Sequence, residues 1–351
     1  MNAKITSQLV YYKSFLFMAQ KKGIFLSLLS ILLLLCAGGA ALGGLGIYKF
    51  LEAGPLEQQR LVHVKSGMGV SAIAALLEKE QVIENALIFN IAARLTEQEG
   101  FLKAGEYEFP AKISMAQALH RVRAGDVFER KVTIPEGLTS YQVVKILEAR
   151  EDLEGEVAQI PEEGTLLPET YLFVAGEQRN DKIKKMQDAL QTILDAAWES
   201  RQAGLPLENK REALTLASII EKETSVAEER RRIAGVFINR LKKGMPLQTD
   251  PTVIYAITKG KIQDEGKGPL GRRLLRKDLD FDDPYNTYKY PGLPPGPIAN
   301  PGKASIEAAL NPESHDYIYF VADGTGGHAF AKTLSEHNAN VAQWRKVRAR
   351  Q

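Results

Sequence analysis

The chain has 351 residues and one cysteine, and 45 lysines and arginines offset 43 aspartates and glutamates to a formal net charge of +2. A chain of this length can bury a sizeable core and form more than one domain. The near-neutral charge gives no general attraction for nucleic acid. One cysteine excludes an internal disulfide framework and a multi-cysteine zinc site. The histidines contain no His-x-x-x-His pair, so we expect neither a metal nor a cofactor.

Residues 23–48 carry no charged side chain and are numerous enough to cross a bilayer as a helix. Residues 1–22 contain four lysines, which favour a cytoplasmic tail. A cleaved signal peptide is the alternative, because Ala37-Gly38-Gly39-Ala40 offers small residues after a leucine run. The apolar stretch continues to Ile47, which is too long for a signal peptide. We therefore expect an uncleaved single-pass anchor and an extracytoplasmic body.

A small α+β module is predicted for residues 61–150. The same pattern occurs three times: a short alternating strand, a Gly or Pro turn, a hydroxyl side chain suited to capping a helix, and an amphipathic helix. The three helices begin near Val70, Ser114 and Thr139. The pattern resembles the LysM-like modules of cell-wall proteins. A spacer domain that binds nothing explains the pattern equally well.

A second, mixed α/β domain is expected over residues 160–348. The pattern predicts a strand at 171–174, a helix at 181–200 and a longer helix from about Arg211 to Leu241, which breaks near a capping box that starts at Ser225. After a short helix at Asp250 come a loop rich in proline and glycine at 292–302, a helix ending at Leu310, strands near 317–321 and 328–330, and a last helix. The expected fold class is therefore α+β throughout.

Two glutamates follow directly on an apolar helical run, Leu216 to Ile220. Glu221 and Glu223 both lie on the flank of the face that should meet a core. One interpretation is that a carboxyl group enters a partly dry cleft, where desolvation raises its pKa towards that of a working acid. The other is a solvated, ion-paired helix surface. The helical pattern does not choose between the two interpretations, or between the two carboxylates.

The loops that follow have the composition of a carbohydrate site. Their amide and hydroxyl side chains can supply the paired donors and acceptors that sugar hydroxyls need, and tyrosine rings can pack on sugar faces. A rigid structural crossing is the alternative for the proline-rich loop. The glycines at 324–327 predict a tight turn rather than a phosphate loop. His328 is either a proton carrier or a hydrogen-bonded part of the scaffold.

Six ordered motifs in the chain resemble the MltG (YceG-like) endolytic murein transglycosylases. The motifs are Glu221-Lys222-Glu223-Thr224, Phe237-Ile238-Asn239-Arg240-Leu241, Leu247-Gln248-Thr249-Asp250-Pro251-Thr252, Tyr285-Asn286-Thr287-Tyr288, Gly292-Leu293-Pro294-Pro295-Gly296-Pro297 and Phe320-Val321-Ala322-Asp323-Gly324 with Gly327-His328. The resemblance runs from the membrane anchor almost to the C-terminus. The stretch from Lys259 to Asp280 diverges.

The resemblance implies a single-pass inner-membrane enzyme that cuts nascent glycan strands internally in the periplasm. It places the catalytic glutamate at Glu221. Glu223 and Asp250 are possible supporting acids, and Asp250 is expected to orient the site or to pair with Arg240. The residues expected to bind the sugar are Gln248, Thr249, Asn286, Tyr288, Asn300 and His328.

Three functions therefore remain to be distinguished. The first is a lytic transglycosylase in which Glu221 acts as acid and then as base, so that no second carboxylate is needed. The second is a lysozyme-like muramidase that uses Glu221 and Asp250. The third is a membrane-anchored cell-wall scaffold. The resemblance also suggests work beside peptidoglycan synthases, the penicillin-binding proteins, which glycines of the membrane helix could contact.

Overall fold

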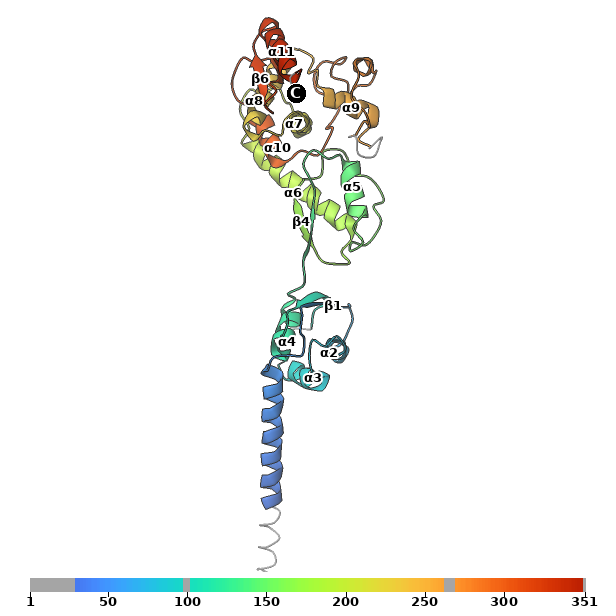
Figure 1. The fold of residues 1–351 in the computed structure, drawn as a ribbon, viewed down its shortest axis with the longest axis vertical. Coiled ribbons are helices and arrows are strands. Elements are labelled where there is room, and N and C mark those ends of the chain that lie inside the picture. Colours follow the sequence, from blue (N-terminus) through green and yellow to red (C-terminus); the bar gives the residue numbers. More distant parts are fainter. Residues whose placement is uncertain (1–28, 97–101, 262–268, 350–351) are drawn as a thin grey trace, which may run out of the picture. The chain divides into compact units, whose positions relative to one another are not determined.

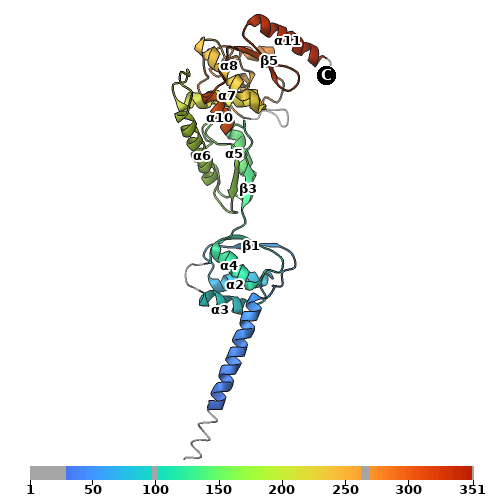
Figure 2. The ribbon, with the colours of Figure 1, turned by 90° about the vertical axis from the view of Figure 1, so that its left-hand side faces the viewer.

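The computed structural model describes residues 29–96, 102–261 and 269–349. The chain divides into two compact units, Met1–Phe128 and Glu129–Gln351. Short strands and helices form both units (Figures 1 and 2), so the α+β class is confirmed. The expected cytoplasmic tail, 1–22, and the first part of the expected span, 23–28, lie outside the described residues.

An apolar helix, Leu29–Leu51, stands near the N-terminus and is long enough to cross a membrane. Its leucines are not used in a core: Leu34 is 73% exposed and Leu35 is 68% exposed. Soluble proteins rarely expose so large a contiguous apolar surface. The helix is therefore suited to anchor the chain in a lipid bilayer.

The first unit has a small two-stranded sheet covered by helices. Strand β1 (Arg60–Val64) pairs antiparallel with β2 (Gly105–Phe109). Alternate residues of both strands are buried, as expected for a sheet with one covered face. Helices α2 (Val70–Lys79), α3 (Ala86–Leu95) and α4 (Met115–Ala124) complete the core.

The third strand–helix segment does not belong to this unit, which corrects the grouping expected for 61–150. Strand β3 (Arg130–Thr133) pairs with β4 (Thr170–Phe173), and both strands pack with α5 (Ser140–Glu148) in a core of the second unit. The local pattern of the three segments is alike. Only the choice of pairing strand, which depends on residues far along the chain, separates the third from the first two.

The second unit is built around one enclosed helix, α7 (Lys210–Glu223). Every residue from Ala213 to Ile220 is buried, as in a helix that packs on all sides. Figure 1 shows α7 among its neighbours, and these elements are α6 (Arg179–Glu199), α8 (Arg230–Lys242), α9 (Asp250–Thr258) and α10 (Lys303–Leu310).

The expected long helix does break near Ser225, but not by the expected capping box. Thr224 is extended and ends α7, and the short 3-10 helix η1 (Ala227–Glu229) leads into α8. The cap position of η1 is Val226, which has no side chain able to cap. Instead the Val226 amide donates to the Thr224 hydroxyl oxygen at 3.0 Å. The break leaves the last turn of α7 at the edge of the core.

The chain then passes through η2 (Arg276–Asp280) and ends in a hairpin and a helix. Strands β5 (Tyr319–Ala322) and β6 (His328–Ala331) pair antiparallel, and α11 (Leu334–Arg348) packs on them. The predicted tight turn between the strands is confirmed. Asp323 accepts the Thr325 and Gly327 amides at 2.7 and 3.3 Å, and Gly324 has a φ of 88°.

Candidate active site

Glu221 and Glu223 occupy the last turn of α7 and face different surroundings. Residues two apart on an α-helix point about 200° apart. Glu221 is partly buried, and its Oε2 accepts the backbone N–H of Gly302, at the start of α10, at 3.0 Å. Glu223 instead accepts the hydroxyl of Thr249, at the start of α9. Each carboxylate therefore joins α7 to a different element.

A loop from the start of the second unit closes the Glu221 side. Gly137 has a φ of 74°, and a side chain at this position would meet Glu221 Cγ at 3.5 Å. Lys222 Nζ donates to the Gly137 carbonyl oxygen at 3.0 Å. The amide of Gly137 donates to Asn300 O at 3.0 Å, and the amide of Asn300 donates to Leu138 O at 2.8 Å. These bonds fix two distant loops against the end of α7.

Glu136 brings a further carboxylate to this side. A Cβ on Gly302 would overlap the Glu136 carboxyl group, so Glu136 and Glu221 meet at the same backbone position. Burial, followed by the charge on Glu221, raises the pKa of Glu136. Arg230 Nη2 lies 3.7 Å from Glu136 Oε2 and opposes the rise, whereas Glu169 adds to it. The acidic residues of this cluster are thus Glu136, Glu169 and Glu221.

The other carboxylate lies in a second cluster, with Asp250. Burial raises the pKa of Glu223, the charge on Asp250 adds to the rise, and His328 and Arg240 oppose it. Asp250 Oδ1 accepts the Tyr288 hydroxyl at 2.7 Å. Burial, with that bond to Asp250, raises the pKa of Tyr288. Tyr288 thus remains a neutral hydrogen-bond donor at neutral pH.

Arg240 does not form the expected pair with Asp250. Its Nε donates to Ile318 O at 2.7 Å and its Nη1 donates to Leu247 O at 2.7 Å. The guanidinium also lies over the Tyr319 ring, and burial lowers its pKa. Arg240 therefore ties α8 to the hairpin and to the segment before α9.

His328 is anchored by a residue outside the sequence motifs. Glu229 Oε2 lies 2.7 Å from His328 Nδ1, and Glu229 Oε1 accepts the His328 backbone N–H at 2.8 Å. The ring also packs edge-on against Phe320, with centroids 5.4 Å apart. These contacts fix the imidazole and direct its other nitrogen away from Glu229.

The model of the YceG-like family matches residues 62–343. The chain belongs to the YceG-like family. A Bacillus subtilis relative called endolytic murein transglycosylase is 35% identical to this chain. The match covers 87% of this chain and 89% of the relative.

The chain is also similar to two further proteins. A Streptococcus pneumoniae protein of the same name is 30% identical over 80% of this chain, which spans 58% of that longer relative. A Listeria monocytogenes crystal structure titled as a putative yceG-like protein is 33% identical, with a TM-score of 0.48, and the match covers 81% of this chain and 99% of that one.

Two of the residues expected to bind sugar are enclosed in this YceG-like chain, which corrects that expectation. Asn286 is fully buried and donates from Nδ2 to the carbonyl oxygens of Leu279 and Phe281. Asn300 is also fully buried and its Oδ1 accepts the Leu166 amide at 2.9 Å. Buried polar groups with such bonds brace loops.

The other expected residues divide by exposure. Thr249 is buried and bonded to Glu223, whereas Gln248 and Asp250 are exposed and Tyr288 is partly exposed. A sugar can therefore reach Gln248, Asp250 and Tyr288. Their contact with substrate stays a prediction.

Glu136 and Glu169 were missed in the sequence because each lies in a short turn before another element. Glu136 stands between Pro135 and Gly137, and Glu169 follows Pro168. A proline beside an acid in two separate turns is the signal that could have found them. It does not show, however, that Glu136 meets Glu221 at Gly302 or that Glu169 lies near Glu136. Within the described ranges no group of three or more His, Cys, Asp or Glu side chains is arranged to hold a metal ion.

Proposed function

We propose that this chain is an endolytic murein lytic transglycosylase. It would cleave the β-1,4 bond between N-acetylmuramic acid and N-acetylglucosamine within nascent glycan strands and leave 1,6-anhydromuramic ends. One observation carries the proposal: the Glu221 carboxyl group is held at the rim of a buried helix by the Gly302 amide, beside the Glu136 carboxyl group. The names of the relatives give the substrate class.

One carboxyl group is sufficient for this reaction. Protonated Glu221 would donate its proton to the glycosidic oxygen as the bond from that oxygen to C1 of the muramic acid breaks. The resulting carboxylate would then accept the proton of the C6 hydroxyl as O6 bonds to C1, which restores the acid. The Gly302 amide fixes Glu221 for both steps. Because the nucleophile belongs to the substrate, no water has to be activated.

The hydrolase alternative would use Asp250 to activate a water molecule. In its favour, Asp250 is exposed and oriented by the Tyr288 hydroxyl. Against it, Asp250 belongs with Glu223 in the second cluster, whereas Glu221 faces Glu136 and Gly302. The scaffold alternative leaves the cluster of Glu136, Glu169 and Glu221 without a role. The transglycosylase is therefore the function that the site supports best.

Product analysis tests the proposal. Purified full-length protein is incubated with uncrosslinked murein strands, and the new ends are identified by mass spectrometry. We expect fragments from within the strands that carry 1,6-anhydromuramic ends and lack the mass of one water. Products with only reducing muramic ends would instead establish the muramidase. An intact strand population would leave only the scaffold.

We also propose the placement of the enzyme. The helix Leu29–Leu51 would anchor it in the cytoplasmic membrane, with residues 1–22 in the cytoplasm and the second unit on the outer side, where murein is found. The lysines before the helix support this orientation. The strand–helix module of the first unit would act as a glycan-binding or spacer part. Penicillin-binding proteins would be partners through the glycine pairs of the helix, Gly38-Gly39 and Gly43-Gly44.

A further inference from the structure

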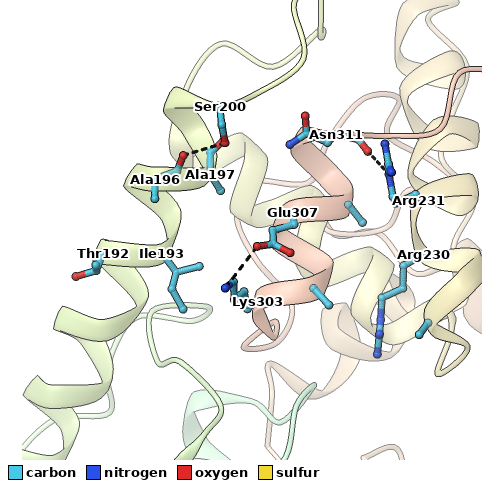
Figure 3. Close-up of a pocket in the computed structure, with 13 residues that line it drawn as sticks. Thr192, Ile193, Ala196, Ala197, Ser200, Arg230, Arg231, Lys303, Glu307 and Asn311 are labelled. Atoms are coloured by element: carbon cyan, nitrogen blue, oxygen red, sulfur yellow. Dashed lines mark hydrogen bonds and ion pairs between the residues drawn. The ribbon is translucent and has the colours of Figure 1, made fainter.

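An open trough lies beside the Glu221 cluster in the second unit. Figure 3 shows α10 as its floor, α6 on one side and the start of α8 on the other. The trough measures about 750 Å³, within the range of sites that hold ligands of drug size. Several lining residues are alanines, among them Ala196, Ala304 and Ala308. Their short side chains leave room above the floor.

Basic side chains line the trough. Arg230, Arg231 and Lys303 all contribute to its surface, against one acid, Glu307. Lys303 Nζ and Glu307 Oε1 are 3.7 Å apart and offset each other, and Arg230 faces Glu136 at the same distance. Arg231 therefore contributes the positive charge of the trough that no acid in its lining offsets. Arg231 is exposed, and its Nε donates a hydrogen bond to the Asn311 carbonyl oxygen at 2.7 Å. Its two terminal nitrogens suit a bidentate carboxylate.

Arg230 gives an independent indication of a ligand. Its Nε is buried, and no hydrogen-bond acceptor reaches it. Leaving such a group without a partner costs about 1–3 kcal/mol. The same side chain lines the trough and reaches to within 3.7 Å of Glu136 Oε2. Arg230 therefore stands between the carboxylates of the candidate active site and the trough.

The trough also adjoins the site along the chain, at the start of α10. The Gly302 amide binds Glu221, and the next residue, Lys303, lines the trough. A substrate bound with its reacting bond at Glu221 would therefore have a substituent within reach of the trough. That substituent should be anionic and extended.

We infer that the trough binds the anionic peptide stem that muramic acid carries in uncrosslinked murein. This inference rests on the proposed function, because it places the cleaved sugar at Glu221. The stem is attached to the same sugar whose C1 reacts, it is extended, and its free carboxylates match the arginines. Small floor residues accommodate a peptide backbone that a bare glycan lacks. Selection of peptide-bearing strands would direct cleavage to newly made material.

Binding and cleavage of two matched substrates test the inference. One is an uncrosslinked glycan strand with its peptides, and the other is the same strand after removal of the peptides by an amidase. Full-length Glu221→Gln protein in detergent is titrated with labelled strands of each kind. We expect the peptide-bearing strand to bind about tenfold more tightly, the value of one charge-assisted hydrogen bond.

Variants of the trough locate the effect. In the Glu221→Gln background, Arg231→Gln together with Lys303→Gln should reduce the preference to about twofold or less by weakening the binding of the peptide-bearing strand. Lys184→Gln is the matched control, because Lys184 also forms an i,i+4 pair, with Asp188 at 3.0 Å, but lies outside the trough. This control should keep the full preference. Circular dichroism confirms that each variant is folded.

The outcomes separate this inference from the proposed function. Equal binding of the two strands, or an undiminished preference in the trough variant, would overturn the peptide-stem site. Absence of cleavage by the unsubstituted protein would overturn the transglycosylase. A binding preference that the trough variant loses would support the site even then, because the Glu221→Gln background measures binding without chemistry.

Discussion

Glu221 and Glu223 are two residues apart in sequence yet have different partners. Glu221 meets the Gly302 amide and Glu136, whereas Glu223 meets the Thr249 hydroxyl and Asp250. Burial raises the pKa of Glu223, and the family resemblance assigns catalysis to Glu221. We interpret Glu223 as a bracing acid, because its hydrogen bond to the start of α9 orders the loop that carries Gln248 and Asp250.

The first prediction separates these two roles. Glu221→Gln removes the transferable proton but keeps the shape and the bond from Gly302, so murein cleavage should fall by about a hundredfold or more. Glu223→Gln can still accept from Thr249 and should lose at most about tenfold, mainly through KM. Release of soluble fragments from murein measures both. Glu199→Gln, an exposed glutamate on α6, is the control. Full activity of Glu221→Gln would refute the catalytic assignment.

The second prediction concerns the pH dependence of stability. Since burial raises the pKa of Glu223 above 4.5, the folded state holds this proton more tightly than the unfolded chain does. The contribution of Glu223 to the stability of the folded protein is therefore fully present below pH 4.5. It is lost as the pH rises through the pKa of Glu223 in the folded state. Glu223→Gln carries no such proton. Its Tm relative to the unsubstituted protein should increase between about pH 4 and pH 8.

Thermal unfolding of both proteins across that range measures the second effect. Glu199→Gln again serves as the control, and its Tm difference from the unsubstituted protein should stay nearly constant. A Tm of Glu223→Gln that falls relative to the unsubstituted protein as the pH rises would contradict the raised pKa of Glu223.

At the scale of elements, helix α8 approaches the loop before the hairpin at one glycine. A Cβ on Gly235 would overlap the Glu313 carbonyl oxygen and the His315 ring. His315 is held there, since its Nε2 lies 2.9 Å from Arg232 O. The carbonyl is held as well, because the Glu313 amide donates to Arg231 O at 2.9 Å. Close packing at Gly235 thus connects α8 to the segment that leads into β5.

The third prediction follows from this packing. In an exposed helix interior, Gly→Ala stabilises by about 1 kcal/mol. Gly235→Ala should do the opposite and destabilise by about 1–3 kcal/mol, as overpacked positions do. Denaturant unfolding measures the difference. Gly69→Ala is the control for an added methyl group without overpacking, because Gly69, the N-cap residue of α2, has a φ of −77° and nothing lies within 4 Å of an added Cβ. It should destabilise by less than Gly235→Ala, since only the N-cap preference for glycine is lost. A stabilised Gly235→Ala protein would show that the approach is not tight.

At the scale of the whole molecule, the chain combines an apolar N-terminal helix with two separately packed units. The exposed leucines of Leu29–Leu51 have no place in either core. The helix is long and apolar enough to cross a membrane, and burial in lipid would account for these exposed leucines. If the helix were instead a cleaved signal peptide, the mature chain would lack it.

The fourth prediction distinguishes anchor from signal peptide. The intact mass of the protein recovered from bacterial membranes should include residues 29–51, and alkaline carbonate should not extract it. Leu34→Arg together with Ala40→Arg should weaken insertion by about 5–7 kcal/mol, since each arginine near the helix centre costs about 2.5–3.5 kcal/mol. Leu172→Arg, an exposed position on β4, controls for the added charge. A mature chain that begins after Ala40 would establish a signal peptide.

The sequence by itself determined most of the helices, the hairpin and the apolar N-terminal helix, because periodicity and length are local properties; it did not predict α3. It also determined the family through ordered motifs. Only the tertiary structure decided that β3 pairs with β4, that Glu136 meets Glu221 at Gly302, and that Asn286 and Asn300 are buried. These facts depend on contacts between residues distant in the chain. The type of a residue shows that its side chain can either bind a sugar or brace a loop. Its surroundings in the folded protein decide which of these two roles it has.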